Sequence, residues 1–261
     1  FVVGADGYFK NGLNDAYIDE LKVYSKLMSE QEIADNYNLN NDEILYLNFN
    51  EENANDISGN ENHGQAFNVT YSEGIDGKAA HIVNTNGSSS QKVSSYINLA
   101  NQIDLETSDF TISFWYKSNV GNEDGGTIIS NKDYKSGTND GFAIGSFTNE
   151  IRANFAFNGR RKDVKFTPTD GLWHHNVVTY DRDGKMLTYT DGIKSGEADI
   201  SEFINDDINI GDLVIGADKN KCYGLLDSYL DEIKIFDSVK SSYEIERLYE
   251  EFKNPIGDML L

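Results

Sequence analysis

The segment Ser108–Ser118 reads SDFTISFWYKS, and apolar residues occupy every second position of its centre. Successive side chains of a β-strand point to opposite faces of the sheet, so this spacing places four of them on one side. These four are Phe110, Ile112, Phe114 and Tyr116. The segment therefore predicts a strand with one face against an apolar core.

Further strands are predicted on both sides of this segment, at Ile44–Phe49, Ile151–Phe157, His174–Tyr180, Lys185–Thr190 and Ser228–Phe236. His174–Tyr180 and Lys185–Thr190 would form a hairpin across the turn 181–184, with Asp183-Gly184 supplying positive φ angles. Many short strands joined by Gly, Asn and Asp turns are typical of an all-β sandwich or closed barrel.

One short helix is predicted near the C-terminus. Ser241 is three residues before Glu244, which is the spacing of a capping box. We expect Ser241 to be the N-cap and Glu244 to occupy the third helical position.

An internal repeat organises the chain, because residues 1–37 recur from position 213 without a gap at a constant offset of 212. The sequence predicts three parts: residues 1–40 as the C-terminal fragment of a preceding repeat, residues 43–252 as one complete domain, and residues 253–261 as a linker. The chain begins in the middle of an expected strand, so we interpret it as an excised piece of a longer protein.

Four stretches, in family order, resemble the laminin-G-like, concanavalin A-like domain family. They are ILYLNFNEENANDISGNENHGQAFN from Ile44, SDFTISFWYKS from Ser108, DGLWHHNVVTYDRDGKMLTYTDG from Asp170, and the closing segment from Leu213. The resemblance implies a two-sheet antiparallel jelly-roll sandwich with neighbouring first and last strands. It also implies a role in glycan binding, adhesion or support of a catalytic domain, among which the fold does not decide.

The net charge of −22 excludes most nucleic-acid ligands and disfavours anionic membranes, because like charges repel. No apolar run is long enough to insert into a membrane. Cys222 is the one cysteine, so no intrachain disulfide can form.

A calcium site is the first candidate site. Ca²⁺ takes six to eight oxygen ligands, and the loop 55–64 is rich in carboxylates and amides. Because the resemblance places the first and last strands together, the closing strand would bring its own carboxylate near this loop. The expected ligands are Asp56, Asn60, Asn62 and Asp231. The alternative is an Asx-turn loop whose side chains bind their own backbone.

A ligand-binding face is the second candidate. The stretch Gly159-Arg160-Arg161-Lys162 is the only dense basic cluster of this acidic chain, and guanidinium groups suit carboxylates and sulfates. The expected ligand-binding residues are Tyr134, Arg152, Asn154, Arg160 and Arg161. The alternative is a solvated hairpin tip.

The remaining conspicuous residues are expected to be structural. Trp115 and Trp173 belong to the fold motifs, and alternation along a strand sends His174 and His175 to opposite faces. The stretch Gln102–Glu106 resembles a glucanase acid pair but has Gln102 in the first acid's place, so we expect no enzyme activity.

The sequence therefore predicts an extracellular or cell-surface, lectin-like carbohydrate-binding or adhesion module, stabilised by calcium. Its expected partners are a glycan or glycoprotein surface and neighbouring domains of the same protein. Two alternatives stay open, namely a structural or protein-interaction spacer without a glycan ligand, and a glycoside hydrolase.

Overall fold

The computed structural model describes residues 42–253 except 86, 88–89, 100–102, 104, 120–124, 149, 167–169 and 210, together with the isolated residues 3, 23, 27–29 and 33. The predicted repeat fragment 1–40 and the predicted linker 253–261 lie almost entirely outside the described residues. The domain boundaries therefore stay a prediction, although the first described strand begins at Glu43 and the last helix ends at Lys253.

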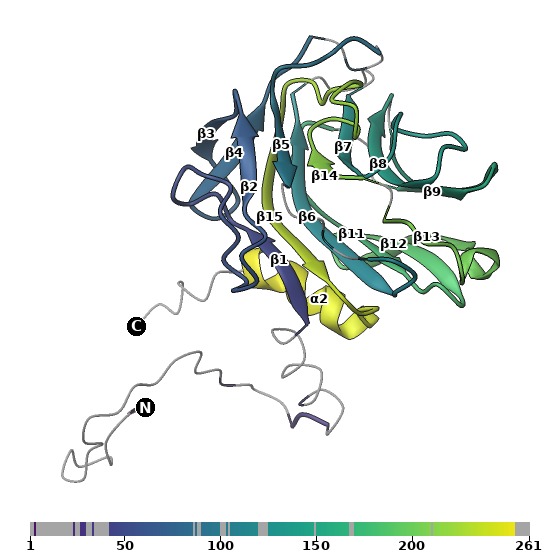
Figure 1. Cartoon of the computed structure of the whole chain (residues 1–261). Helices are drawn as coiled ribbons and strands as arrows, with labels where there is room; N and C mark the ends of the chain where they lie inside the picture. The colour runs from purple at the N-terminus through teal and green to yellow at the C-terminus, as the bar shows by residue number, and fades with distance from the viewer. Residues whose placement is uncertain are drawn as a thin grey trace. The chain divides into compact units, whose positions relative to one another are not determined.

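Within the described residues the strands form two antiparallel sheets (Figure 1). The first sheet contains eight strands, β1 (Glu43–Leu47), β3 (Thr70–Glu73), β4 (Lys78–Ile82), β6 (Phe110–Ser118), β11 (His174–Tyr180), β12 (Lys185–Thr190), β13 (Ile193–Asp199) and β15 (Ser228–Phe236). Their order is β13-β12-β11-β6-β15-β4-β3, and β1 pairs with β15 beside this path.

The second sheet contains seven strands among the described residues: β2 (Gly64–Phe67), β5 (Tyr96–Leu99), β7 (Gly126–Ser130), β8 (Gly141–Phe147), β9 (Glu150–Phe157), β10 (Arg160–Phe166) and β14 (Leu213–Ile215). Their order is β10-β9-β8-β7-β14-β5-β2. The two-sheet antiparallel jelly-roll sandwich expected from the sequence is confirmed, as are all five strands predicted beside β6.

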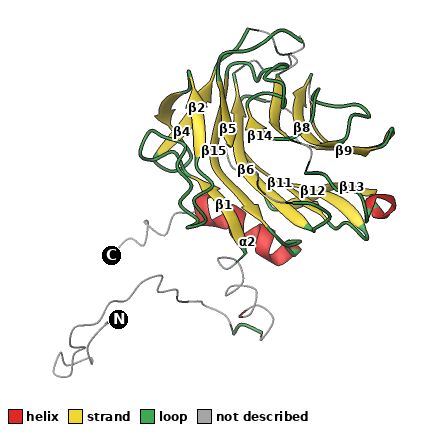
Figure 2. Cartoon of the chain, in the orientation of Figure 1, coloured by secondary structure: helices red, strands yellow, loops and turns green. Residues whose placement is uncertain are grey.

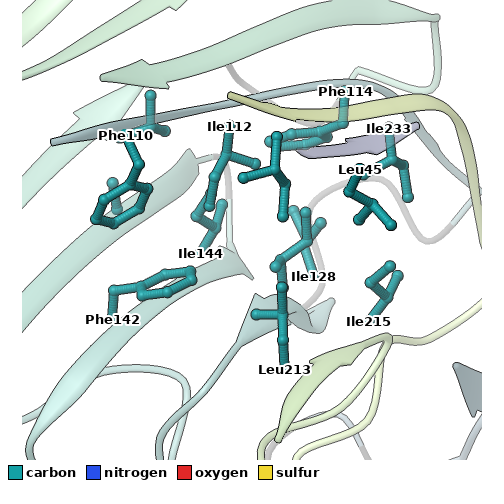
Figure 3. Close-up of a cluster of buried hydrophobic side chains, with 14 of the residues drawn as sticks. Leu45, Phe110, Ile112, Phe114, Ile128, Phe142, Ile144, Leu213, Ile215 and Ile233 are labelled. Carbon is teal, nitrogen blue, oxygen red and sulfur yellow. The ribbon is translucent and has the colours of Figure 1, made fainter. Parts of the chain in front are cut away.

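The core lies between the sheets and consists of the alternate side chains of each strand (Figure 3). Phe110, Ile112 and Phe114 of β6 point across to Phe142 and Ile144 of β8. All five are fully buried, and burial of each such side chain contributes roughly 1.5–3 kcal/mol. The period-two pattern of the sequence thus decides which face of each strand meets the core.

The first and last strands lie side by side, as the family resemblance implied (Figure 1). Leu45 pairs with Ile235 and Leu47 with Ile233, so both strands place apolar residues in the core in register. At the opposite side, β10 and β13 approach closely at Gly196. A Cβ at that position would lie 2.6 Å from Val164 Cγ1, so only glycine fits between these strands.

The hairpin β11–β12 forms as predicted, but its turn differs from the expected one. Neither Asp183 nor Gly184 has a positive φ. The connection has four residues, and the Gly184 amide donates to the Asp181 carbonyl at 3.1 Å, which is the hydrogen bond of a β-turn. The Asp181 carboxylate lies over Gly184, where a Cβ would come within 2.3 Å of Oδ2 and would displace that side chain.

Helix α2 (Ser242–Lys253) lies against the outer face of the eight-stranded sheet (Figure 2). Its capping box is confirmed: the Ser241 amide donates to Glu244 Oε2 at 2.7 Å, and the Glu244 amide to Ser241 Oγ at 3.3 Å. A short 3-10 helix, η1 (Ser201–Phe203), follows β13. None of the described helices is long and apolar enough to span a membrane.

Candidate functional site

The loop predicted to bind calcium is held together by its own hydrogen bonds. Asp56 is buried, and its Oδ1 accepts from the amides of Tyr46 and Ser58, both at 2.9 Å. Its Oδ2 accepts from the Asn62 amide at 2.9 Å. The carboxylate therefore already satisfies three backbone donors, which is the geometry of the Asx-turn alternative.

The amides of Asn60 and Asn62 anchor this loop to the first strand. Asn60 Nδ2 donates to the Glu43 carbonyl at 2.8 Å, and Asn62 Nδ2 donates to the Ile44 carbonyl at 2.7 Å. Both side-chain nitrogens thus face the backbone of β1. Three of the four expected ligands share one loop.

Among the described residues, the hydrogen bonds of Asp231 go to other partners than that loop. Its Oδ2 accepts from the Ile75 amide at 2.9 Å and its Oδ1 from the Glu232 amide at 2.9 Å. The Asp56 carboxylate is held at the Tyr46 amide, and Tyr46 pairs with Lys234, three residues from Asp231, which corresponds to roughly 10 Å of strand. No group of three or more His, Cys, Asp or Glu side chains suited to a metal occurs among the described residues. Calcium binding stays a prediction.

Two of the predicted ligand residues, Arg152 and Asn154, lie on the outer face of β9, opposite the core residues Ile151, Ala153 and Phe155. Asn154 is fully buried because a segment covers this face. Its Nδ2 donates to Asp163 Oδ1 at 2.7 Å, and its Oδ1 accepts from Lys132 Nζ at 2.5 Å. Asn154 therefore supports this face and does not present an exposed amide.

Arg161 joins the same face from β10. Its Nη2 lies 2.8 Å from Asp163 Oδ2, so the Asp163 carboxylate bridges Arg161 and Asn154. On the next rung, Lys165 pairs with Arg152, and both reach the Glu150 carboxylate, at 2.9 Å and 2.5 Å. Partial burial raises the pKa of Glu150, but its hydrogen bonds from Lys165 and Arg152 prevail and hold that pKa below its ordinary value.

The covering segment is the loop 131–140 between β7 and β8, which contributes two lysines. Lys132 and Lys135 are both buried, and Lys132 Nζ also donates to the Gly137 carbonyl at 3.0 Å. Lys135 Nζ and the Arg152 guanidinium each lie 4.3 Å from the centre of the Phe147 ring. Burial lowers the pKa of both lysines to about 8.

We call these five positive groups, Lys132, Lys135, Arg152, Arg161 and Lys165, the cationic face. Sequence reasoning found Arg152 and Arg161 but missed Lys165 and the two loop lysines. The signal that could have found them is Gly145, an outward position of β8. A Cβ there would lie 3.1 Å from Lys135 Cβ, and a glycine inside a strand often marks the close approach of another segment.

The structure separates Arg160 from Arg161. Neighbouring residues of a strand point to opposite faces, so Arg160 turns away from the cationic face. Its Nη2 lies 2.5 Å from Asp206 Oδ2, its Nη1 donates to the Glu202 carbonyl at 2.7 Å, and its guanidinium lies 4.8 Å from the Phe203 ring. The basic cluster seen in the sequence is therefore divided between two environments.

Tyr134 lies on the covering loop but faces a different neighbour. Its ring meets Tyr223 edge to face at 4.6 Å, and its amide donates to Asp218 Oδ2 at 2.9 Å. Tyr134 is exposed with a positive φ of 65°, a conformation held here by the Asp218 bond. The structure does not connect Tyr134 to the arginines by a hydrogen bond among the described residues.

The other conspicuous residues have separate partners. Trp115 is buried, and its ring lies 5.8 Å from Tyr249 of α2. His175 is buried with Nε2 2.8 Å from Ser113 Oγ, and burial lowers its pKa to about 3. His174 lies between Asp191 at 2.8 Å and Asp170 at 3.1 Å. The two histidines therefore do not share one site.

The comparisons with known proteins agree with this architecture. The sequence model described as the concanavalin A-like lectin/glucanases superfamily matches residues 87–246. No curated protein matches the chain significantly. The binding domain of Paraclostridial Mosquitocidal Protein 1 has 21% identity and a TM-score of 0.67, and the match covers 83% of this chain and 53% of that one.

Two botulinum neurotoxin structures are similar in the same way. The binding domain of neurotoxin DC, in complex with rat synaptotagmin II, has 16% identity and a TM-score of 0.63, and the match covers 82% of this chain and 52% of that one. A structure of botulinum neurotoxin type C, a toxin whose cell entry depends on two ganglioside molecules, has 16% identity and a TM-score of 0.64. That match covers 83% of this chain and 52% of the neurotoxin chain. At these identities the likeness shows the fold alone, and this chain spans about half of each neighbour.

Proposed function

The chain belongs to the concanavalin A-like lectin/glucanases superfamily, and from this premise we propose that it is a non-catalytic module that binds glycans or glycoproteins outside the cell. The similar solved structures include binding domains, one of them in complex with rat synaptotagmin II, and a botulinum neurotoxin type C structure from work on cell entry through two ganglioside molecules. These neighbours support a binding role, and the superfamily's glucanases are the reason to test for turnover as well.

The observation that carries this proposal is the cationic face. Arg152, Arg161 and Lys165 present exposed or partly exposed positive groups on one side of β9 and β10, around the carboxylates of Glu150 and Asp163, in a chain of net charge −22. Lys132 and Lys135 are buried behind them. The buried bonds of Lys132 to Asn154 and of Asn154 to Asp163 fix the scaffold beneath them. Guanidinium and ammonium groups of fixed position favour ligands with carboxylate or sulfate groups. The ligand class is therefore an anionic glycan.

The test is an array of sulfated, sialylated and neutral oligosaccharides, with binding to a positive hit then measured by calorimetry. The variants are Arg161→Ala and Lys165→Ala, whose side chains are 43% and 65% exposed. Each lost charge-assisted bond should weaken binding about 10- to 100-fold. The matched control is Lys185→Ala, 53% exposed and paired with Glu197 on the other sheet.

Binding of anionic glycans that survives both variants would remove the cationic face from the proposal. Silence towards every glycan would favour the spacer or protein-interaction alternative, and release of reducing ends from a defined glycan would favour a hydrolase. Because surface charge attraction is screened, affinity at the cationic face should also fall between 0.05 and 0.5 M salt, by roughly tenfold.

Calcium stabilisation is a separate proposal. The supporting feature is the oxygen-rich loop 55–64, in which Asp56 and both asparagines lie together. Calcium titration of the chain by calorimetry should give heat and raise the melting temperature. A silent titration would leave Asp56 as a residue of the turn alone.

A further inference from the structure

A row of side chains crosses the outer face of the eight-stranded sheet, away from the cationic face. The strand register pairs Thr70 with His81, His81 with Tyr229, and Tyr229 with Lys117. Trp173 continues the row directly before β11. We call these five residues the aromatic row. All belong to different segments, so only the folded sheet brings them together.

The strand pattern directs this row outward. The neighbouring residues Ala80, Leu230 and Tyr116 belong to the core between the sheets, and alternate positions must therefore face out. Two residues before Lys117, Trp115 lies under Tyr249 of helix α2. His81, Lys117, Trp173 and Tyr229 are half-buried instead, and the adjacent Leu172 and Val83 are exposed.

The rings of the row are arranged as a rigid group. His81 and Tyr229 stack with centroids 4.2 Å apart and an interplanar angle of 8°. Trp173 meets Tyr229 edge to face at 6.3 Å. Lys117 Nζ lies 4.9 Å from the Tyr229 ring and 6.0 Å from the Trp173 ring. The mutual contacts fix the orientation of each ring before any ligand binds.

Polar groups border the row on one side. Asp227 Oδ1 lies 2.6 Å from His81 Nε2 and 3.1 Å from Asn119 Nδ2. The backbone N–H of Asn119 also donates to the backbone carbonyl of Asp227 at 2.9 Å, so two hydrogen bonds hold these residues together. Among the described residues no hydrogen bond reaches Asp227 Oδ2, and this side chain is 43% exposed. A carboxylate and an amide thus stand at a fixed place beside the aromatic rings.

We propose that the aromatic row is a second binding site, specific for a neutral hexopyranose unit. The axial C–H groups of a pyranose form an apolar patch that suits an aromatic ring, and a small number of directed polar groups is typical of such sites. Asp227 Oδ2 accepts from a ring hydroxyl group, and Asn119 Oδ1 accepts from a neighbouring hydroxyl, since Asn119 Nδ2 already donates to Asp227 Oδ1 and the Tyr229 hydroxyl. Lys117 donates to an oxygen above Tyr229.

The charge of this site selects a neutral sugar. Asp227 stands at its rim with an exposed carboxylate oxygen, which repels a carboxylate or sulfate placed where the sugar hydroxyl groups would bind. The cationic face has the opposite preference. The second site does not depend on the first, because the two lie on the outer faces of different sheets.

The chain provides its own reporter for a test. Its two tryptophans, Trp115 and Trp173, give two indole Nε1–H resonances, and only Trp173 belongs to the row. Titration of the full ¹⁵N-labelled chain with methyl β-galactopyranoside or methyl β-glucopyranoside should shift the Trp173 resonance and leave Trp115 in place. A single sugar of this size should saturate with a Kd on the order of 1 mM.

The variants separate this site from the cationic face. Asp227→Asn should weaken the Trp173 response about tenfold. Trp173→Ala, followed by saturation transfer to the sugar, should abolish binding. Tyr134→Ala is the aromatic control, and Arg161→Ala and Lys165→Ala should leave the response unchanged.

Three outcomes would overturn the proposal. One is a Trp173 resonance that stays in place at tens of millimolar of both sugars. Another is an equal shift of both tryptophans, which would indicate a general effect. The third is a methyl glucuronide response as strong as that of the neutral sugars. Failure of anionic glycan binding would not bear on this site.

Discussion

A helix covers the outer face of one sheet, whereas a loop covers the outer face of the other. Helix α2 packs Ile245 against Val177 and Tyr189 on the eight-stranded sheet. The loop 131–140 packs on β8 and β9 through two lysines. Lys132 donates a hydrogen bond to Asn154, and Lys135 lies over the ring of Phe147. The first cover is apolar, and the second is charged and hydrogen-bonded.

The difference shows how each cover is stabilised. Apolar contact under the helix is non-directional and tolerates small shifts. The loop instead depends on directed bonds to buried groups, and each of these is costly when one partner is lost. We expect the sheet face under the loop 131–140 to have a more fixed geometry than the face under α2, and to be more sensitive to single polar substitutions. Such a fixed geometry suits a binding surface.

The largest effect should come from removing the aromatic contact under the helix. Trp115→Ala deletes a buried ring between the sheet and Tyr249, and should lower the free energy of unfolding by about 3–5 kcal/mol. Urea unfolding of the variant and of the unchanged chain measures this loss of free energy. The matched control is Trp173→Ala, which is half-buried and should cost about 1 kcal/mol. Equal losses for the two variants would contradict the distinction between covered and open parts of this sheet.

The next effect should come from the centre of the loop face. Asn154→Ala leaves the Lys132 ammonium and the Asp163 carboxylate without their shared partner, and should lower the free energy of unfolding by about 2–3 kcal/mol. Asn139→Ala is the control, since this exposed side chain of the same loop makes one bond, to the Asp133 carbonyl. A loss below that of the control would mean that the loop is held by other contacts.

The two faces should respond to pH with opposite signs. Burial raises the pKa of Glu232, which lies near α2, to about 8 from its ordinary 4.5, and that of Glu43 to about 7. Their protonated forms stabilise the fold, fully below the unfolded pKa, and that contribution is lost as the pH rises through 7 to 8. Burial lowers the pKa of Lys132 to about 8 from 10.5, so its contribution grows as the pH rises from 8 towards 10.5.

The free energy of unfolding should therefore pass through a minimum near pH 8, with each limb amounting to a few kcal/mol, and the melting temperature measured against pH should follow it. Glu232→Gln should flatten the limb below pH 8, and Lys132→Met the limb above it. If Glu232→Gln changed the alkaline limb instead, the assignment of the limbs to the two faces would be wrong.

The smallest effect should come from the helix cap. Ser241→Ala removes the hydroxyl that accepts from the Glu244 amide, and should lower the free energy of unfolding by about 1 kcal/mol. Hydrogen exchange should show faster opening of α2 while β8 and β9 are unchanged. Faster exchange in the loop 131–140 as well would indicate that the two covers are coupled.

The aromatic row and the cationic face illustrate the limit of reading sites from sequence. Alternation alone could have separated Arg160 from Arg161, since adjacent strand residues face opposite ways. It could not have shown that Lys132 contacts Asn154, because the path of a loop depends on what it packs against. Trp173 was expected to pack structurally, and its place beside Tyr229 and Lys117 follows from the register of three strands.

The two-sheet sandwich was expected from the family resemblance. The sequence by itself determined six strands (β1, β6, β9, β11, β12 and β15), the core faces of β6 and β9, and the capping box. These follow from local periodicity and local hydrogen bonding, which a strand or helix carries wherever it lies. The tertiary structure alone decided that Asp231 binds the Ile75 turn, that the loop lysines join the cationic face, and that five segments form the aromatic row. Such contacts depend on register and closure between residues distant in the chain, and these are properties of the whole fold.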